Sequence, residues 1–407
     1  MSKTKKLLFI MMFFMVVIAC LMPNLNSGDG SDPYKHVAAS STAEPSVEDV
    51  TVVMPENYKV GNTSNFVNED TSVDNKISDI IDSMTVEEKV AQLFFIKNDS
   101  RFDASVLEEY PVGGIILFSS DFAGETQDSL KEKLDSFQTN SDIPLLLGVD
   151  EEGGDVVRVS NYSALASDRF LSPRDLYNQG GYDAVLNDTI HKSELLLSYG
   201  INVNFAPVCD VSLEPTDYMY SRSFGVSAEA TADYIDIVVG AMEEENMGSV
   251  LKHFPGYGSN GDTHTDVIRD TRSYEEFVQN DFLPFKAGIE QGADCVLVSH
   301  NIVECMDSEW PASLSSKVID TLREELGFEG VVITDDLMMG GVSNYVSEEE
   351  SAVRAIIAGN DMILSTNYQL QYQSVLDAVL DGTISEERID ESVRRILLWK
   401  YELGLIK

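Results

Sequence analysis

Charged and polar side chains directly follow five short apolar runs in this 407-residue chain. Carboxylates, lysines and histidines are the side chains that most often bind polar substrates and exchange protons with them. A hydrophobic core does not need such groups at these positions, whereas a polar pocket does. The sequence therefore predicts a polar pocket assembled from the ends of several strands. The five segments are Asp150–Gly154, Ala206–Asp210, Lys252–Gly258, Ser299–Asn301 and Thr334–Asp336.

These segments belong to a longer series in which strand-like runs alternate with amphipathic, helix-like stretches. Most of the runs are continuously apolar, as in strands that are buried on both faces of a parallel sheet. Eight such repeats in about 330 residues predict an α/β fold of the (β/α)8 TIM-barrel type. A doubly wound open sheet is the alternative, because periodicity cannot show closure. The runs are Val90–Ile96, Gly114–Phe118, Pro144–Val149, Val203–Val208, Ser249–His253, Cys295–Ser299, Gly330–Thr334 and Asp361–Ser365.

The helix candidates complete this pattern. In a (β/α)8 barrel the active site lies at the carboxyl ends of the strands, which is where the polar segments fall. The last candidate places Ile389, Val393, Ile396 and Lys400 on one face and is expected to close the barrel. Only four residues follow it, so we expect no second domain. The candidates are Ser129–Gln138, Ala228–Glu245, Tyr274–Gln291, Ser315–Leu326 and Ser385–Leu403.

The N-terminus predicts export from the cytoplasm. Three lysines within the first six residues precede the apolar run Leu7–Met22, as in a signal peptide, and the run is shorter than a comfortable membrane span. The segment Val17–Cys20 resembles the bacterial lipobox, in which the cysteine is lipidated, while an uncleaved anchor or secretion is the alternative. Residues 23–73 are rich in Ser, Asp, Asn, Thr and Pro and predict a disordered tether. We expect residues 74–407 to form the barrel, outside the membrane and held to it only through the N-terminus.

Composition excludes several classes of partner. The chain has 28 Lys and Arg against 69 Asp and Glu, a formal charge of −41. Such a surface repels nucleic acid and anionic lipid. Four cysteines, one of them Cys20 in the leader, do not make a disulfide framework, and no Cys/His cluster indicates zinc.

One glycine pattern needs a separate interpretation. Gly256, Gly258 and Gly261 fit the dinucleotide fingerprint G-x-G-x-x-G. The polar stretch 262–266 that follows does not open an amphipathic helix, as the fingerprint requires. We therefore expect neither a nicotinamide nor a flavin, and no metal or other cofactor.

The stretch VLKHFPGYGSNGDTH at residues 250–264 resembles the signature of glycoside hydrolase family 3, in its β-N-acetylglucosaminidase branch. Further segments are similar to the same family and occur in its order, from about residue 75 to the end of the chain. They include MTVEEKVAQLFFI, VDEEGGDVVRV, INVNFAPVCDVS, YSRSFG and GFEGVVITDDLMMGGV. Many glucose- and xylose-cleaving members take their proton donor from a second domain after the barrel, so the expected single domain also favours this branch.

The resemblance implies a retaining double displacement. Asp335 matches the family's nucleophile, although its neighbour Asp336 is the obvious alternative. Asp262 and His264 match an Asp-x-His dyad that serves as the general acid and base, a role for which the unperturbed pKa of histidine near 6.5 is suitable. His300, after the sixth run, is considered as a wall of the pocket.

Sugar-binding residues are also implied by the resemblance. Asp150, Arg222, Lys252 and His253 match positions that bind sugar hydroxyls in the terminal subsite, and Arg158 matches a position near the same pocket. Ordinary salt bridges around a barrel rim are the alternative interpretation of all five.

The chain departs from the family pattern on the side of the leaving group. Tyr257 replaces a frequent histidine, the segment at Asp150 reads DEEGG where DQEGG is common, and Asp155 takes a position that is often basic. The loop between Gly258 and Asp262 is one residue shorter than in many members. We expect a more acidic rim, which would disfavour anionic leaving groups such as muropeptides.

The expected activity is that of an exo-β-N-acetylglucosaminidase acting on carbohydrate, with cell-wall or chitin-type fragments and glycoprotein sugars all open as substrates. A β-glucosidase or other β-hexosidase of the same family is the alternative enzyme, and transfer of the sugar to phosphate stays open. A tethered, non-catalytic sugar-binding protein is the alternative from another class. The oligomeric state does not follow from the sequence.

Overall fold

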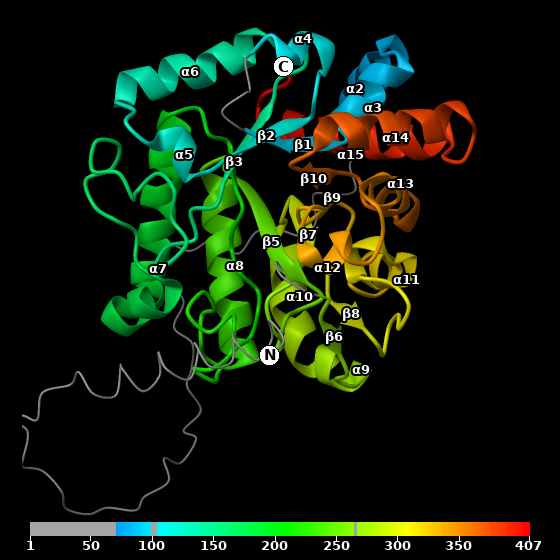
Figure 1. Cartoon of the computed structure of the whole chain (residues 1–407). Helices are drawn as coiled ribbons and strands as arrows, with labels where there is room; N and C mark the ends of the chain where they lie inside the picture. The colour runs from blue at the N-terminus through cyan, green and yellow to red at the C-terminus, as the bar shows by residue number, and fades with distance from the viewer. Residues whose placement is uncertain (1–70, 99–103, 264–266) are drawn as a thin grey trace, which may run out of the picture. The chain divides into compact units, whose positions relative to one another are not determined.

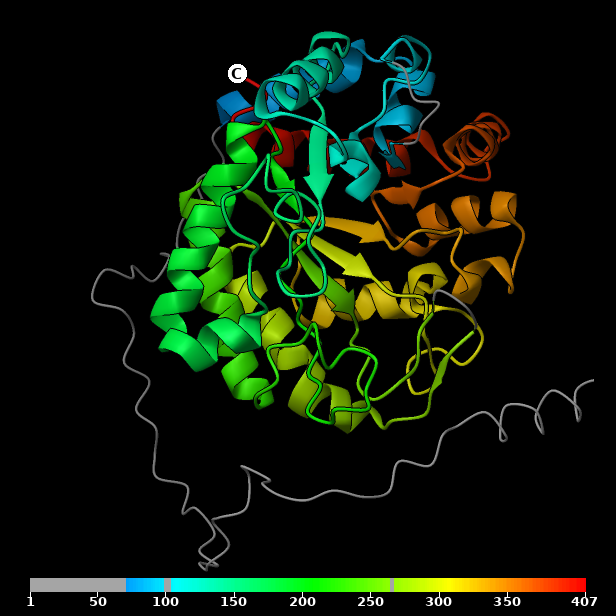
Figure 2. The same ribbon diagram turned by 60° about the vertical axis from the view of Figure 1, so that its left-hand side comes forward.

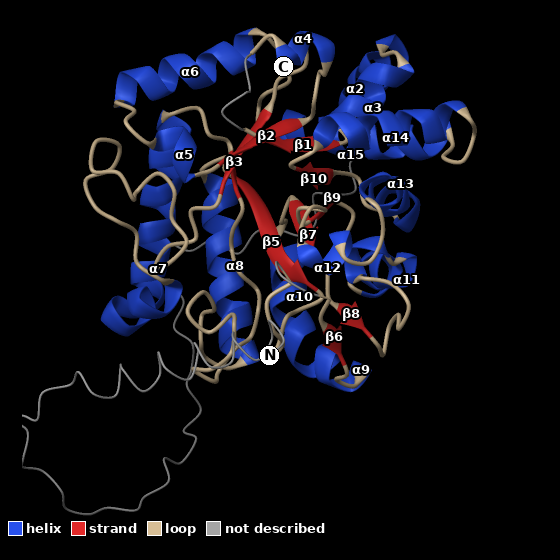
Figure 3. Cartoon of the chain, in the orientation of Figure 1, coloured by secondary structure: helices blue, strands red, loops and turns tan. Residues whose placement is uncertain are grey.

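The computed structural model describes residues 71–98, 104–263 and 267–407, which all belong to the compact unit Met54–Lys407. Its centre is a sheet of eight parallel strands in the order β10-β1-β2-β3-β4-β5-β7-β9 (Figures 1 and 3). The strands are β1 (Phe94–Lys97), β2 (Gly114–Leu117), β3 (Leu146–Val149), β4 (Val203–Asn204), β5 (Gly248–Phe254), β7 (Cys295–Val298), β9 (Val331–Thr334) and β10 (Ile363–Ser365).

The two ends of this sheet meet. A parallel bridge joins Ile333 of β9 to Met362, which directly precedes β10, and the Thr334 amide donates to the Met362 carbonyl at 3.2 Å. Each of the eight predicted runs overlaps one of these strands. The predicted (β/α)8 barrel is therefore confirmed, and the open-sheet alternative is wrong.

Helices surround the strands, as Figures 1 and 2 show. They are α2 (Thr71–Ser83), α3 (Val86–Gln92), α4 (Val106–Glu109), α5 (Ser119–Phe122), α6 (Gln127–Thr139), α7 (Pro173–Ser198), α8 (Ala228–Glu244), α9 (Tyr274–Glu276), α10 (Phe282–Gln291), α11 (Ser316–Asp320), α12 (Gly340–Ser343), α13 (Glu348–Ala358), α14 (Tyr368–Leu380) and α15 (Glu386–Glu402). A short π-helix at Phe277–Asp281 joins α9 to α10, and another at Thr321–Glu325 follows α11. A small ribbon pairs β6 (Arg269–Asp270) with β8 (Ile302–Val303).

The first predicted run was wrong in part. Val90–Gln92 form the end of helix α3, whose N-cap Thr85 makes a capping box with Glu88, and the strand begins only at Phe94. The buried face of this helix continues directly into the buried strand. Periodicity alone therefore could not separate the two elements.

The barrel interior beneath the pocket is filled by aromatic rings that two glycines make room for. Phe95 of β1 and Phe205 after β4 pack edge to face, with ring centroids 5.1 Å apart. A Cβ on Gly148 would lie 2.5 Å from the Phe205 ring, and one on Gly114 would lie 2.7 Å from the Phe95 ring. The interior is a packed core, so a pocket can form only above it.

The closing helix packs as predicted. Ile389, Val393, Ile396 and Lys400 of α15 are all buried. The Lys400 ammonium donates to Gln92 Oε1 at 2.7 Å, and burial lowers the pKa of Lys400 to about 7. The helices of the described residues include none that is long and apolar enough to span a bilayer. The predicted leader, and the tether up to residue 70, lie outside the described residues and stay predictions.

A buried carboxylate holds the closure of the barrel. Asp361, just before β10, has no exposed surface and accepts a hydrogen bond from the Val332 amide of β9 at 3.0 Å. It also pairs with Arg323 at 2.6 Å and with Arg395 of α15 at 3.0 Å. Arg388 lies 3.8 Å from the same carboxylate. The Asp361 side chain thus connects β9 and β10, the two strands that close the barrel, with the helical segments outside them.

We expect Asp361→Asn to lower the free energy of unfolding by about 3 kcal/mol or more, because it removes a fully buried carboxylate charge from three partly buried guanidinium groups. Asp74→Asn is the matched control, since Asp74 pairs with the neighbouring Arg394 of α15 at 2.8 Å but is half exposed. It should cost about 1 kcal/mol or less. Urea denaturation measures both. Equal losses would contradict the role given to Asp361.

Candidate active site

A cavity of about 410 Å³ opens at the carboxyl ends of the strands. Its volume suits a small ligand such as a sugar unit. Ile116, Leu297 and Leu364 contribute apolar surface to its lining. Six of the eight predicted site residues line it together, although they lie far apart in the sequence. They are Asp150, Arg158, Arg222, Lys252, His253 and Asp335.

Glu152, which the sequence did not single out, organises one wall of this cavity. Its carboxylate accepts from Arg222 Nε at 2.9 Å and Nη2 at 2.6 Å, and from Lys252 Nζ at 2.7 Å. Burial disfavours its charged form, but Arg222 and Lys252 outweigh burial and hold the pKa of Glu152 well below its usual range. Burial disfavours the charged form of Arg222 as well, but Glu152 outweighs burial and raises the pKa of Arg222. The three side chains therefore hold one another in place through short ion pairs.

Asp150 extends this arrangement toward the cavity. It accepts from Lys252 Nζ at 2.7 Å, and its other oxygen lies 3.6 Å from Arg158 Nη2. Lys252 thus joins two carboxylates, one in the cavity lining and one buried behind it. The Asp150 side chain is 16% exposed, so part of it can meet a ligand.

His253 is held in one tautomer by its two neighbours. Its Nδ1 lies 2.7 Å from Asp210 Oδ2, and its Nε2 lies 3.2 Å from Arg222 Nη2. Because the guanidinium can only donate, Nε2 accepts and Nδ1 carries the proton that it donates to Asp210. Asp210 also accepts from the amides of His253 and Tyr257, at 3.1 and 2.8 Å, and so fixes the turn after β5.

The two neighbouring aspartates after β9 differ in their surroundings. Asp336 accepts from the Met338 amide at 3.0 Å and from the Thr366 hydroxyl, and burial raises the pKa of Asp336. The Asp335 amide donates to the Val298 carbonyl at 3.0 Å, and Asp335 Oδ1 accepts from the Asp336 amide at 2.8 Å. Both side chains line the cavity, and Asp335 is the one that directly follows β9, the position that the resemblance assigns to the nucleophile.

His300 does not line the cavity, contrary to one expectation. It is fully buried, with Nδ1 2.7 Å from the Ser313 hydroxyl and Nε2 3.0 Å from the Asp336 carbonyl. Both ring nitrogens therefore have protein partners. Its contribution is to support the segment that carries the aspartates.

The loop after β5 is anchored by a partly buried arginine. Arg272 pairs with Asp281 at 2.8 Å and with Asp270 at 2.7 Å, and it donates to the Gly256 carbonyl at 3.0 Å. A Cβ on Gly256 would lie 2.2 Å from Asp281 Oδ1, and one on Gly258 would lie 2.5 Å from the Arg272 guanidinium. Both residues also have positive φ, at 121° and 55°. The glycines of this motif therefore serve close packing against an ion pair.

The end of the same loop is fixed beside the cavity. Thr263 is buried, its hydroxyl bonds Tyr257 Oη, and its carbonyl accepts from the Gly341 amide at 2.9 Å. The hydroxyl of Tyr218, a cavity residue, bonds Asp262; burial first, and then Asp262, raises the pKa of Tyr218 to about 12. His264 lies outside the described residues, so its predicted pairing with Asp262 stays a prediction.

Several residues of the site were not identified from the sequence. Glu152 and Asp210 lie in the polar segments after β3 and β4, so the signal was present but did not tell them from their neighbours. Tyr218 lies in a loop without a motif of its own. Among the described residues, no group of three or more His, Cys, Asp or Glu side chains is placed to hold a metal ion.

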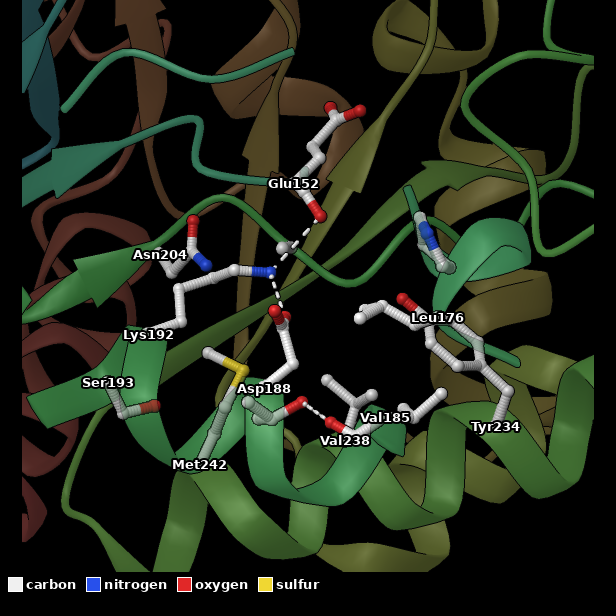
Figure 4. Close-up of a pocket in the computed structure, with 13 residues that line it drawn as sticks. Glu152, Leu176, Val185, Asp188, Lys192, Ser193, Asn204, Tyr234, Val238 and Met242 are labelled. Carbon is white, nitrogen blue, oxygen red and sulfur yellow. Dashed lines mark hydrogen bonds and ion pairs between the residues drawn. The ribbon is translucent and has the colours of Figure 1, made fainter. Parts of the chain in front are cut away.

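A second, much smaller cavity of about 20 Å³ lies behind Glu152, between the barrel and helices α7 and α8 (Figure 4). Its volume is about that of one water molecule. Lys192 of α7 donates to the Glu152 carbonyl at 3.3 Å and pairs with Asp188 at 3.0 Å. Figure 4 shows the Glu152 carboxylate pointing away from this cavity. The Lys192 contact supports the turn after β3, and the cavity itself is too small for a sugar.

Curated relatives of the chain are bacterial hexosaminidases. A β-hexosaminidase of Nitrosomonas eutropha is 32% identical over 268 residues, which cover 63% of this chain and 74% of the relative. One of Xanthomonas campestris pv. campestris is 34% identical over 69% of this chain and 84% of its own. β-Hexosaminidase LpqI of Mycobacterium tuberculosis is 30% identical over 78% of this chain and 83% of its own.

Solved structures agree with these relatives. A glycoside hydrolase family 3 β-N-acetylglucosaminidase from Paenibacillus superposes with a TM-score of 0.74 at 31% identity, over 79% of this chain and 63% of that chain. M. tuberculosis LpqI superposes with a TM-score of 0.71 at 29% identity, over 80% of this chain and 96% of that chain. This chain therefore spans less than two thirds of the Paenibacillus enzyme.

The Glycosyl hydrolase family 3 N terminal domain matches residues 85–398, far more than half of the chain and all eight strands. This match and the relatives above agree with the geometry of the cavity. The chain therefore belongs to glycosyl hydrolase family 3 and is a glycoside hydrolase.

Proposed function

We propose that this chain is a retaining exo-β-N-acetylglucosaminidase that removes terminal, non-reducing, β-linked GlcNAc. The observation that carries the proposal is that Asp335 shares one cavity with Asp150, Arg222 and Lys252, which ion pairs hold in place. The names of the relatives supply the sugar, since several of them are β-hexosaminidases. The alternative function is that of a β-glucosidase of the same family, in which the same cavity would hold glucose.

Asp335 acts as the nucleophile in this proposal. A carboxylate oxygen attacks the anomeric carbon and forms a glycosyl ester, while the glycosidic oxygen leaves with the bonding pair and takes up a proton. Water then attacks the same carbon from the opposite side and releases the sugar with its configuration retained. The Asp336 amide, which donates to Asp335 Oδ1 at 2.8 Å, orients the attacking carboxylate.

His264 supplies the proton to the leaving group and later removes one from water. Asp262 holds the imidazole and stabilises its charged form, as a carboxylate does in other His–Asp pairs. The proposal is supported by the placement of the preceding residues. Asp262 bonds Tyr218 of the cavity lining, and Thr263 is tied to Tyr257 and Gly341, so the two residues before His264 are held beside the cavity.

The terminal sugar is bound by the polar side chains of the cavity. Lys252, Asp150, Arg222 and His253 would exchange part of their mutual hydrogen bonds for sugar hydroxyls. Their positions are set before substrate arrives, because Glu152 and Asp210 fix them from behind. Such preorganisation lowers the entropic cost of binding in one orientation.

We also propose that the enzyme works outside the membrane as a lipoprotein attached at Cys20, on cell-wall or chitin-type fragments. The N-terminal sequence alone supports this location. Cys20→Ala should move the protein from the membrane fraction to a soluble one. Unchanged fractionation would exclude lipid attachment at this cysteine.

We expect Asp335→Asn to lower kcat by about 1,000-fold or more, because the amide cannot form the glycosyl ester. Asp336→Asn is the matched control and should keep far more activity, since its carboxylate is bonded to protein groups. Release of nitrophenol from β-GlcNAc and β-glucose substrates measures both variants and the sugar preference. Faster turnover of the glucose substrate by the wild type would favour the β-glucosidase alternative.

We expect His264→Ala to lower kcat/KM by about 100-fold or more for an oligosaccharide, whose leaving group needs a proton, and much less for a nitrophenyl glycoside. Asp262→Asn should shift the basic limb of the pH profile to lower pH, because loss of the carboxylate charge lowers the pKa of the acid. Initial rates across pH measure both effects. The same loss on both substrates would contradict the role of His264 as the acid.

A further inference from the structure

Tyr218 joins two loops that leave neighbouring strands of the barrel. It belongs to the loop between β4 and α8, and its partly exposed side chain lines the cavity that holds Asp335. Its hydroxyl bonds Asp262, which belongs to the loop after β5. Because β4 and β5 are adjacent in the sheet, the two loops leave the barrel side by side. The contact therefore connects the cavity wall with the carboxylate of the proposed acid and base.

The Tyr218 hydroxyl is the donor in this hydrogen bond. Burial, and then the charge of Asp262, raises the pKa of Tyr218 to about 12. Asp335 acts in the same direction, whereas Arg222 opposes it. The phenol therefore keeps its proton at neutral pH, where an ionised carboxylate can only accept. The charges of Asp262 and Asp335 thus both act on one hydroxyl, which belongs to neither of the loops that carry them.

The Tyr218 ring packs against Tyr257, the residue that replaces a frequent histidine of the family. The two ring centroids lie 5.8 Å apart, and Tyr257 is fully buried. The Tyr257 amide donates to Asp210 at 2.8 Å, and the Tyr257 hydroxyl bonds Thr263, the residue after Asp262. One buried ring thus supports Tyr218 and, at the same time, the neighbour of the residue that Tyr218 bonds.

Hydrogen bonds within its own loop fix the backbone on both sides of Tyr218. The Ser223 hydroxyl donates to the Ser212 carbonyl at 3.1 Å, and the Ser212 hydroxyl donates to Asp217 at 3.0 Å. The Ser223 amide donates to the Met219 carbonyl at 2.9 Å. Asp217 and Met219 are the two neighbours of Tyr218 in the chain. The hydroxyl is therefore presented from a fixed backbone, as a residue that positions another one requires.

We infer that Tyr218 is a positioning residue of the acid and base step, because its hydroxyl holds the Asp262 carboxylate in one orientation beside the cavity. This inference rests on the proposed function. Asp262 is partly exposed, so without the phenol its side chain would be free to turn toward water. A carboxylate that is already oriented loses less entropy in the transition state. Tyr218 lies between the segments that resemble the family, so no motif indicated it.

The test is a double-mutant cycle of Tyr218→Phe and Asp262→Ala. Phenylalanine keeps the ring and removes only the hydroxyl, and alanine removes the carboxylate that the hydroxyl holds. One substrate is the β-linked GlcNAc disaccharide, whose leaving group needs a proton, and the other is nitrophenyl β-GlcNAc, whose leaving group does not. Each protein is measured for kcat/KM on both substrates and for the inhibition constant of free GlcNAc, which reports on the terminal subsite.

We expect Tyr218→Phe to lower kcat/KM for the disaccharide by about tenfold, and for the nitrophenyl substrate by about twofold or less. The inhibition constant of GlcNAc should stay unchanged. In the Asp262→Ala protein, Tyr218→Phe should cause no further loss, because the group on which the hydroxyl acts is gone.

Tyr220→Phe is the matched control, because it removes a hydroxyl from the same loop. The Tyr220 ring packs against Arg174 instead, with the guanidinium carbon 3.7 Å from the ring centre. This change should leave kcat/KM for both substrates unchanged. A tenfold loss from Tyr220→Phe would mean that the loop as a whole, rather than the Tyr218 hydroxyl, determines the rate.

The cycle separates failure of the inference from failure of the proposed function. No loss from Tyr218→Phe, an equal loss on both substrates, or losses that multiply in the double variant would overturn the inference alone. Full activity of Asp262→Ala on the disaccharide would overturn the proposed acid and base, and the inference with them. If the wild type cleaves only glucose compounds, the proposed sugar is wrong, and the same cycle on a β-linked glucose disaccharide decides the role of Tyr218.

Discussion

The site depends on one buried carboxylate with two cations. Glu152 takes ion pairs from Arg222 and Lys252, and through them it sets the positions of Asp150 and His253. An isolated charge in such a place would be very unfavourable, and the group would neutralise instead. Because both cations are present, the carboxylate stays ionised, and each cation keeps a defined position before substrate binds. The loss of any one member leaves another buried charge unpaired.

The barrel separates this functional ion cluster from a structural one. Asp361 collects its arginines at the amino end of β10, where they join the closing strands to the outer helices. The Glu152 cluster occupies the opposite, carboxyl ends of the strands. Between them lies the packed interior with Phe95 and Phe205, for which Gly114 and Gly148 leave room. Stability and ligand binding are therefore served by different residues at different ends of one sheet.

The loop after β5 shows how a sequence motif can be explained by packing. Gly256 and Gly258 allow the backbone to approach the Arg272–Asp281 pair, which a Cβ at either position would prevent. The end of the same loop is held by Thr263, whose carbonyl accepts from the Gly341 amide, and by Asp262, which bonds Tyr218 of the cavity lining. The loop from Gly256 to Thr263 is thus held by packing at its start and by hydrogen bonds at its end. The proposed acid and base belong to that segment and the residue after it.

The sequence by itself determined the number and order of the strands and the segments that carry the site. Strands buried on both faces are continuously apolar, so each of the eight was visible, and polar residues after them marked the pocket. The boundary at Val90–Gln92 was missed because a buried helix end and a buried strand look alike. Only the tertiary structure decided that the sheet closes through Ile333 and Met362. It also decided that His300 supports Asp336 rather than lining the cavity.

Glu151 and Glu152 show most clearly what cannot be predicted from the sequence. Glu151 and Glu152 have the same side chain and the same local sequence, yet Glu151 binds the amides of its own loop while Glu152 binds Arg222 and Lys252. The partners of Glu152 come from the loop between β4 and α8 and from β5, about 70 and 100 residues along the chain. Residue type and spacing describe what a segment contains. The direction of a side chain, and the charges that it meets there, depend on how distant segments pack together.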